Sequence, residues 1–333
     1  MLNLSKITTF LYFRLYNSKK IHTFALETKH IAFVCAFTIL IMNNNEKIDK
    51  LLNLKILTPS QEELEQARKE YLIWQKSSPN NFSYWFPKIK FAEDDVVKIP
   101  MSRIVSVPED LLDAFFMEGN KEQRAKHKEN IKTWIRKSLL PAIEEIPSPR
   151  WFLKNGCYSG KYNFGKCCLL NSDDEDNVYN HVMEIQGESL MFETNGNLEM
   201  VVREFIEPAA GTPEIYNGMP LRPEVRWFYD FDKHKILYGK FYWDWNYCHD
   251  LICKNEKDKN VYEKVYSKLH EEYERLEDKH FCSVSAALSR VEGLSGIWSV
   301  DFILEENRVW LIDMALGECS AYYDSSLIKS ANV

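Results

Sequence analysis

The sequence predicts an α+β protein, in which helices dominate the first part of the chain and strands paired in hairpins dominate the rest. From residue 46 to about 75, apolar residues recur at helical spacing. After Arg150, short apolar runs separated by turns take over, and only one long helical pattern interrupts them. The chain has 333 residues, of which 45% are hydrophobic. This is enough for one large core or two modest ones.

The first 41 residues carry an unusual N-terminal pattern. Residues 31–42 form an apolar run that follows scattered cations, from Arg14 to Lys29. This run is too short to span a bilayer, and no small-residue cleavage site follows it. We therefore expect residues 1–41 to be an extension that is disordered or non-native, with no stable membrane insertion. A membrane anchor is the alternative.

Residues 42–150 are expected to form an N-terminal α/β region. Two helices are predicted between residues 46 and 75, and Thr58-Pro59-Ser60 separates them. A strand is predicted over 102–107, where Pro108 begins a helix. The charged segment 121–137 reads as a solvated helix that Pro141 ends.

Residues 151–333 are expected to form the second region, which would hold the functional site. A helix is predicted over 259–280, with Val261, Val265 and Leu269 on one stripe. Trp243, Trp245 and Tyr247 are expected to alternate along a strand. The predicted strands cover residues 151–154, 199–206, 225–230, 236–243, 297–304 and 309–314.

Charge and cysteine usage exclude several classes of function. The formal net charge is −7, so no broad positive field exists to attract nucleic acid or an anionic membrane. Any phosphate chemistry must come from a few local cations. The eight cysteines form no CxxC pair and have no zinc-ligand spacing. They indicate reduced thiols, and hence a cytoplasmic protein.

Two aspartates give the strongest local signal. The run 300–313 predicts a β-hairpin in which Asp301 and Asp313 lie near one another on one face. If Leu304 pairs with Arg308, Asp301 lies opposite Leu311 and Asp313 is its diagonal neighbour. Such carboxylates could share a hard cation such as Mg²⁺. The alternative is two polar residues at fraying strand ends.

A second signal is a strand that leads into a loop of small residues. The strand delivers Lys154, and the loop carries Ser159 and Lys161. Backbone N–H groups of such a loop can approach an anion, and lysines supply charge. The spacing is not that of a Walker A loop. The alternative is an ordinary hairpin with a lysine at its mouth.

Two further segments place arginines beside strands. The apolar run 201–206 carries Arg203 and Glu204, which face either a ligand or each other. Arg222 and Arg226 could contact phosphates with two hydrogen bonds each. The alternative for these two arginines is a structural ion pair with Glu224.

The order of these motifs resembles the ATP-grasp superfamily over roughly residues 150–323. The resemblance implies two α+β lobes that hold ATP between antiparallel sheets. It implies that Lys154, Ser159 and Lys161 contact phosphates, and that Arg203, Glu204, Phe205 and Ile206 line the nucleotide slot. It also implies that Arg226 and Lys161 act in catalysis, and that Asp301 and Asp313 hold Mg²⁺.

Short segments between residues 82 and 325 are also similar to the cell-division-cycle-123 family. They are Phe82–Pro87, Pro100–Ile104 with Val107-Pro108, Glu224–Phe228, Tyr242–Trp245, and Leu311–Asp313 with Gly317-Glu318. Members of that family are ATP-grasp proteins that assist assembly of a translation initiation factor. The metal strand here reads Asp313-Met314-Ala315, where many ATP-grasp enzymes have Glu-x-Asn. Glu318 is the candidate for the missing metal ligand.

The resemblance leaves two functions to compare. The first is an ATP-dependent carboxylate–amine or carboxylate–thiol ligase, which forms an acyl-phosphate on a small or peptide substrate. The second is an ATP-binding assembly factor that holds a protein client without ligation.

Overall fold

The computed structural model describes residues 61–115, 120–191, 197–252 and 254–330. The chain divides into two compact units, Met1–Trp74 and Gln75–Val333. In the first unit, the described residues belong to helix α4 (Gln61–Ser77), which continues past the division point. The sequence changes from helical patterns to short strand patterns near residue 150, whereas the contacts between residues divide the chain after Trp74. Residues 1–41, the first of the two helices predicted between residues 46 and 75, and the separating Thr58-Pro59-Ser60 lie outside the described residues.

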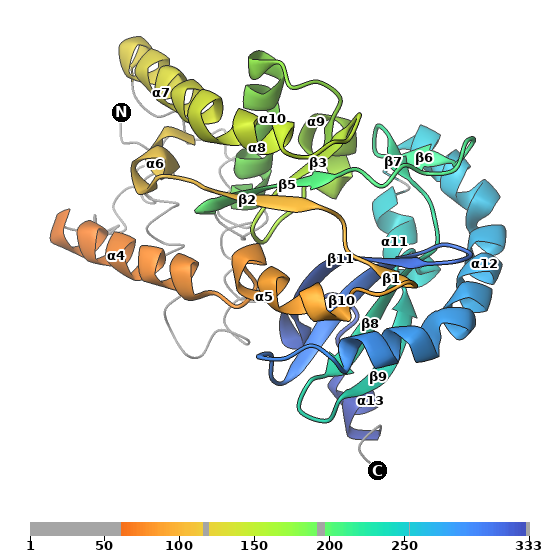
Figure 1. The fold of residues 1–333 in the computed structure, drawn as a ribbon. Coiled ribbons are helices and arrows are strands. Elements are labelled where there is room, and N and C mark those ends of the chain that lie inside the picture. The colour runs from red at the N-terminus through yellow and green to blue at the C-terminus, as the bar shows by residue number, and fades with distance from the viewer. Residues whose placement is uncertain (1–60, 116–119, 192–196, 253, 331–333) are drawn as a thin grey trace, which may run out of the picture. The chain divides into compact units, whose positions relative to one another are not determined.

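The second unit contains a four-stranded sheet in the order β2-β5-β3-β4. Its pairings are antiparallel. Helix α8 packs against β2, and α10 packs against β3 and β4 (Figure 1). The strands are β2 (Ser102–Ser106), β3 (Trp151–Asn155), β4 (Leu169–Leu170) and β5 (Glu199–Glu204).

A five-stranded sheet in the order β1-β11-β10-β8-β9 forms the other layer of this unit. Its pairings are antiparallel except for that of β1 with β11. Helix α12, of 33 residues, packs against β8, β9 and β10 (Figure 1). The strands are β1 (Val97–Lys98), β8 (Glu224–Asp230), β9 (Lys235–Phe241), β10 (Ile297–Leu304) and β11 (Val309–Leu316).

The remaining elements of the second unit connect or cover these sheets. Strands β6 (Glu214–Ile215) and β7 (Met219–Pro220) form a separate small hairpin. The helices are α5 (Phe82–Ile89), α6 (Leu112–Phe115), α7 (Lys121–Trp134), α8 (Leu140–Glu144), α9 (Phe164–Cys167), α10 (Glu175–Met191), α11 (Trp245–Ile252), α12 (Glu256–Leu288) and α13 (Ser325–Ser330). No helix within the described ranges is both long and apolar enough to cross a membrane.

The α+β class predicted from the sequence is confirmed, and the predicted strands lie close to the observed ones. Two local predictions were wrong. Pro141 does not end the helix that begins at Lys121, because it lies in the first turn of α8, where a missing N–H is tolerated. Helix α8 directly follows α7 and a π-helical segment over Ile135–Leu139.

Trp245 begins α11 and does not continue a strand. The reason is Asp244. Its carbonyl accepts the N–H of Cys248 at 2.8 Å, and its carboxylate accepts the N–H of Tyr247 at 3.2 Å. These bonds satisfy N–H groups of the first helical turn.

The register of β10 and β11 also differs from the predicted one. Leu304 pairs with Val309, and Phe302 pairs with Leu311. A bulge at Ile312 then shifts the register, so that Asp301 pairs directly with Asp313. A bulge adds one residue to one strand and changes which side chains face each other beyond it. The length of the hairpin loop in the sequence does not predict this bulge.

Candidate functional site

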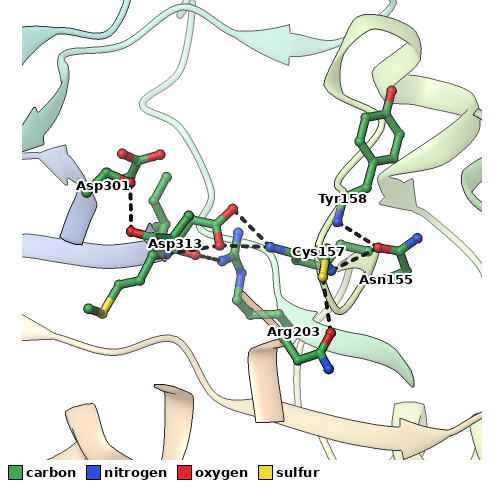
Figure 2. Close-up of polar contacts among 12 residues, drawn as sticks. Asn155, Cys157, Tyr158, Arg203, Asp301 and Asp313 are labelled. Atoms are coloured by element: carbon green, nitrogen blue, oxygen red, sulfur yellow. Dashed lines mark hydrogen bonds and ion pairs between the residues drawn. The ribbon is translucent and has the colours of Figure 1, made fainter. Parts of the chain in front are cut away.

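Asp301 and Asp313 lie opposite each other on adjacent strands. Directly opposed residues of an antiparallel pair share one sheet face, with Cβ atoms about 5 Å apart. Figure 2 shows the two residues side by side, with Asp313 nearer the loop that carries Asn155. The Asp301 side chain is 4% exposed and that of Asp313 is 30% exposed. The structure therefore brings the two predicted acids together.

Arg226 holds Asp301 from the neighbouring strand. It pairs with Asp301 across β8 and β10. Its Nε donates to Oδ1 and its Nη2 to Oδ2, both at 2.7 Å. Burial acts to lower the pKa of Arg226, but the charge of Asp301 outweighs it and raises that pKa. This bidentate ion pair lies within one sheet and keeps Arg226 charged.

Lys154 holds Asp313 from the other sheet. Its Nζ lies 2.8 Å from Oδ1 and 2.9 Å from Oδ2 of Asp313. The Lys154 side chain is 2% exposed, so its ammonium group is buried against this partner. Burial acts to raise the pKa of Asp313, but Lys154 outweighs it and holds that pKa below its ordinary value.

The loop after β3 turns toward the same site. The carboxamide oxygen of Asn155 accepts the N–H of Cys157 at 3.0 Å and that of Tyr158 at 2.6 Å (Figure 2). The carbonyl of Ser159 accepts a hydrogen bond from the thiol of Cys168. Gly160 adopts φ +59°, the left-handed region that favours glycine. The loop is thus held by its own polar groups.

Lys161 ends this loop and lies against an aromatic ring. Its Nζ donates to the hydroxyl of Tyr242 at 3.3 Å and lies 4.4 Å from the centre of that ring. Burial acts to lower the pKa of Lys161, but the nearby phenol and the carboxylates of Glu224 and Asp301 raise it overall. Lys161 is therefore a cation at the site.

Arg203 reaches β11 from β5. Its Nη1 donates to the carbonyl of Ile312, the bulged residue (Figure 2). Burial lowers its pKa to about 10. Phe205 and Ile206 follow the end of β5 and are buried, and Ile206 packs with Ile303 and Ile312. Glu204 is half-buried.

Glu318 is not brought to the acid pair. It is exposed in a short turn after β11. Within the described part of the chain, the only group of three acidic, cysteine or histidine residues with ligand atoms close enough for a metal is Cys167, Glu184 and Glu188. Glu318 thus forms no such group with Asp301 and Asp313.

Charges gather around the acid pair with an excess of cations. Five cations and three carboxylates interact in one cluster, which leaves two positive charges in excess. Glu199 also faces Lys154, and counting it leaves one. We call this set the charged cluster. Its members are Lys154, Lys161, Arg203, Arg222, Arg226, Glu224, Asp301 and Asp313.

Several buried polar atoms of the charged cluster lack hydrogen-bond partners among the described residues. They are Nε of Arg203, Nε of Arg222 and Oε2 of Glu224. Such atoms are costly to bury and call for a partner. Together with the excess of positive charge, the two arginine N–H groups fit an anion with oxygen acceptors, whereas Oε2 of Glu224 is an acceptor and calls for a donor or a cation. The pair of carboxylates fits one hard divalent cation beside it.

A cavity of about 140 Å³ adjoins the charged cluster, and sequence analysis did not predict it. Lys161 and Arg226 line it, and its other walls are mostly tyrosines. These tyrosines come from separate loops and turns and from helix α11, so no sequence run reveals that they meet. The tyrosines are Tyr158, Tyr162, Tyr216, Tyr242, Tyr247 and Tyr322.

Two structures of Cdc123 are among the solved structures to which this chain is similar. No family model matches this chain. No curated protein matches it. A C-terminally truncated Cdc123 from Schizosaccharomyces pombe aligns with a TM-score of 0.45 and 14% identity, over 75% of this chain and 89% of its own. A second structure of Cdc123 from that organism aligns with a TM-score of 0.40 and 13% identity, over the same shares of the two chains. We take no residue role from either.

Proposed function

We propose that the second unit, Gln75–Val333, binds Mg·ATP at the charged cluster. The observation that carries this proposal is the pair Asp301 and Asp313, face to face on adjacent strands and each held by a buried cation. A buried cluster with more cations than carboxylates is suited to a polyphosphate. Lysines and arginines around opposed carboxylates supply both halves of a metal–phosphate site.

Each residue has a definite role in this proposal. Asp301 and Asp313 would hold Mg²⁺, which keeps most of its ligands as water and phosphate oxygens. Lys154, Lys161 and Arg226 would contact phosphate oxygens, with Ser159 on the adjoining loop. Arg203, Glu204, Phe205 and Ile206 would line the rest of the nucleotide. When bound, ATP would supply an activated phosphoryl group.

We favour an assembly factor over a ligase as the use of this site. Of the three carboxylates in the charged cluster, only Asp301 and Asp313 oppose each other across a strand pair, and each already has a cationic partner. Two acids suffice for one metal ion, whereas phosphoryl-transfer sites often hold two. A site with two acidic metal ligands suits a bound nucleotide that stabilises the conformation in which this chain holds a protein client. The free thiols of the described cysteines suit the cytoplasm as the place of action.

The experiment has two stages. Isothermal titration calorimetry of the full chain with Mg·ATP should show saturable binding that EDTA weakens. Absence of binding to the folded protein would refute the proposal.

Phosphate release is then measured with pooled amino acids, thiols and small carboxylates. Binding without release, together with capture of a client only when ATP is present, supports the assembly factor. Substrate-dependent release of ADP and phosphate would establish the ligase instead.

A further inference from the structure

The tyrosine-lined cavity beside the charged cluster has the size of one aromatic ring. Its volume is about 140 Å³. A protein cavity of about 150 Å³ is known to accept benzene. A whole nucleotide is far larger than such a space. The cavity therefore suits one side chain or one small group, and not the ATP of the proposed function.

Aromatic pairs frame the cavity on three sides. Tyr162 meets Tyr216 edge to face, with ring centres 5.4 Å apart. Tyr247 and Tyr322 come from different segments, and their ring centres are 4.6 Å apart. On the third side, Tyr242 packs against Trp243 at 5.2 Å. Walls of this kind favour another ring, because offset and edge-to-face contacts add to simple burial.

The cations at this cavity give it a charge preference. Arg226 is neutralised by Asp301, and its Nη1 donates to the carbonyl of Ala321 at 3.3 Å. Lys161 differs, because its only hydrogen bond to another described residue is to the neutral hydroxyl of Tyr242. It forms no ion pair with any carboxylate in the described ranges. Carboxylates act on Lys161 only from a distance, so this half-buried ammonium group has no direct ion-pair partner among the residues that the structure describes and can accept an anion in contact.

The cavity is accessible from the protein surface. Tyr162 is 50% exposed and Tyr247 is 47% exposed, and both line the cavity. Partly exposed tyrosines at a cavity mouth are typical of recognition surfaces, since they bury large area at small entropic cost. The occupant can therefore be part of a larger chain.

We propose that this pocket binds the C-terminal residue of a client polypeptide, when that residue is aromatic. The ring would lie between the tyrosines and the terminal carboxylate would lie at Lys161. The reasoning is one of size, because a ring and a carboxylate must share this small space. No aromatic side chain carries a carboxylate, so within an unmodified polypeptide a single residue offers both groups only at the C-terminus. The proposal rests on the proposed function, since Lys161 also belongs to the phosphate site.

Three fluorescein-labelled peptides test this proposal by fluorescence anisotropy with the full chain. One ends in phenylalanine with a free carboxylate, the second is its C-terminal amide, and the third ends in alanine with a free carboxylate. We expect the first to bind at least about tenfold more tightly than either of the others, because each lacks one recognised group. Equal binding of the amide, or of the alanine peptide, would overturn the proposal. So would failure of the first peptide to bind.

Two variants separate the pocket from the rest of the surface. Tyr247→Ala should weaken the first peptide about tenfold and leave its thermal unfolding close to that of wild type. Phe281→Ala is the matched control, since Phe281 is 42% exposed on α12 and does not line the pocket. This control should bind the peptide like wild type.

The same proteins are titrated with Mg·ATP as an independent readout. Peptide selectivity without nucleotide binding would sink the proposed function and keep the pocket. Nucleotide binding without peptide selectivity would refute the pocket proposal and keep the proposed function.

Discussion

Replacing Asp313 by asparagine tests the part of the site on which both proposals depend. Asparagine keeps the shape but removes the charge that Lys154 needs. Lys154 is 2% exposed and both oxygens of Asp313 lie within 2.9 Å of its ammonium group. Because this ion pair is buried, the substitution should destabilise the protein as well as remove a proposed metal ligand.

The magnitude follows from the burial of the two partners. Breaking a buried ion pair from one side costs about 3–5 kcal/mol. Asp313 is 30% exposed, so water relieves part of this loss. We expect the free energy of unfolding to fall by roughly 2–3 kcal/mol. For a domain of this size, the midpoint of thermal unfolding should fall by about 4–12 °C. Binding of Mg·ATP should be lost.

Denaturant unfolding and calorimetry are the assays, and two further variants are the controls. Lys154→Met combined with Asp313→Asn should recover most of the lost stability, because no unpaired charge remains buried. It should still fail to bind nucleotide. Glu306→Gln removes an exposed ion-pair partner of Arg275 and Lys279, and should change neither property much. If Asp313→Asn matches wild type in both stability and binding, the assignment of the site is refuted.

Three further predictions concern the same region. Arg226→Lys should weaken Mg·ATP by at least about tenfold in calorimetry, because lysine cannot reproduce the two parallel bonds to Asp301. An unchanged affinity for Mg·ATP would show that the two parallel hydrogen bonds from Arg226 to Asp301 do not matter for binding. Gly160→Ala should destabilise the protein by about 1–3 kcal/mol in denaturant unfolding, since its Cβ would lie 2.7 Å from Cβ of Cys167 and its φ is +59°. A neutral effect would mean that the loop relaxes freely. Lastly, the pKa of Asp313 is lower in the folded state, so its stabilising contribution is complete above pH about 4 and is lost as pH falls through the folded pKa. The stability difference between wild type and Asp313→Asn, measured against pH, should therefore shrink in acid, and a constant difference would contradict this.

Much of the second unit could be predicted from the sequence because its signals are local. The predicted strands near Lys154, Arg226 and Asp301 match β3, β8 and β10 within a few residues. The alternation of apolar and polar residues, together with turn residues at the ends, predicts such strands without knowledge of the strands with which they pair. The long helix was also foreseen, although α12 runs from Glu256 to Leu288 and so exceeds the predicted range at both ends.

The arrangement of the site was less predictable, because it depends on pairing between distant segments. Opposition of Asp301 and Asp313 arises from a bulge, which shifts the register after Phe302. The predicted register lacked that shift and still placed both acids on one face. Glu318 was proposed from its closeness in sequence to Asp313, but it lies exposed beyond the strand end. The roles of these residues in binding stay predictions.

The two ion pairs at the acid pair differ in what they join. Arg226 and Asp301 occupy neighbouring strands of one sheet, so their attachment is fixed by the backbone ladder. Lys154 and Asp313 belong to different sheets, and Arg203 makes a second link of this kind through the carbonyl of Ile312. An anion that competes with Asp313 for Lys154 would therefore weaken a contact between the two sheets. Occupancy of the site by such an anion should then change the rate of amide hydrogen exchange along β3 and β11, even where no turnover takes place.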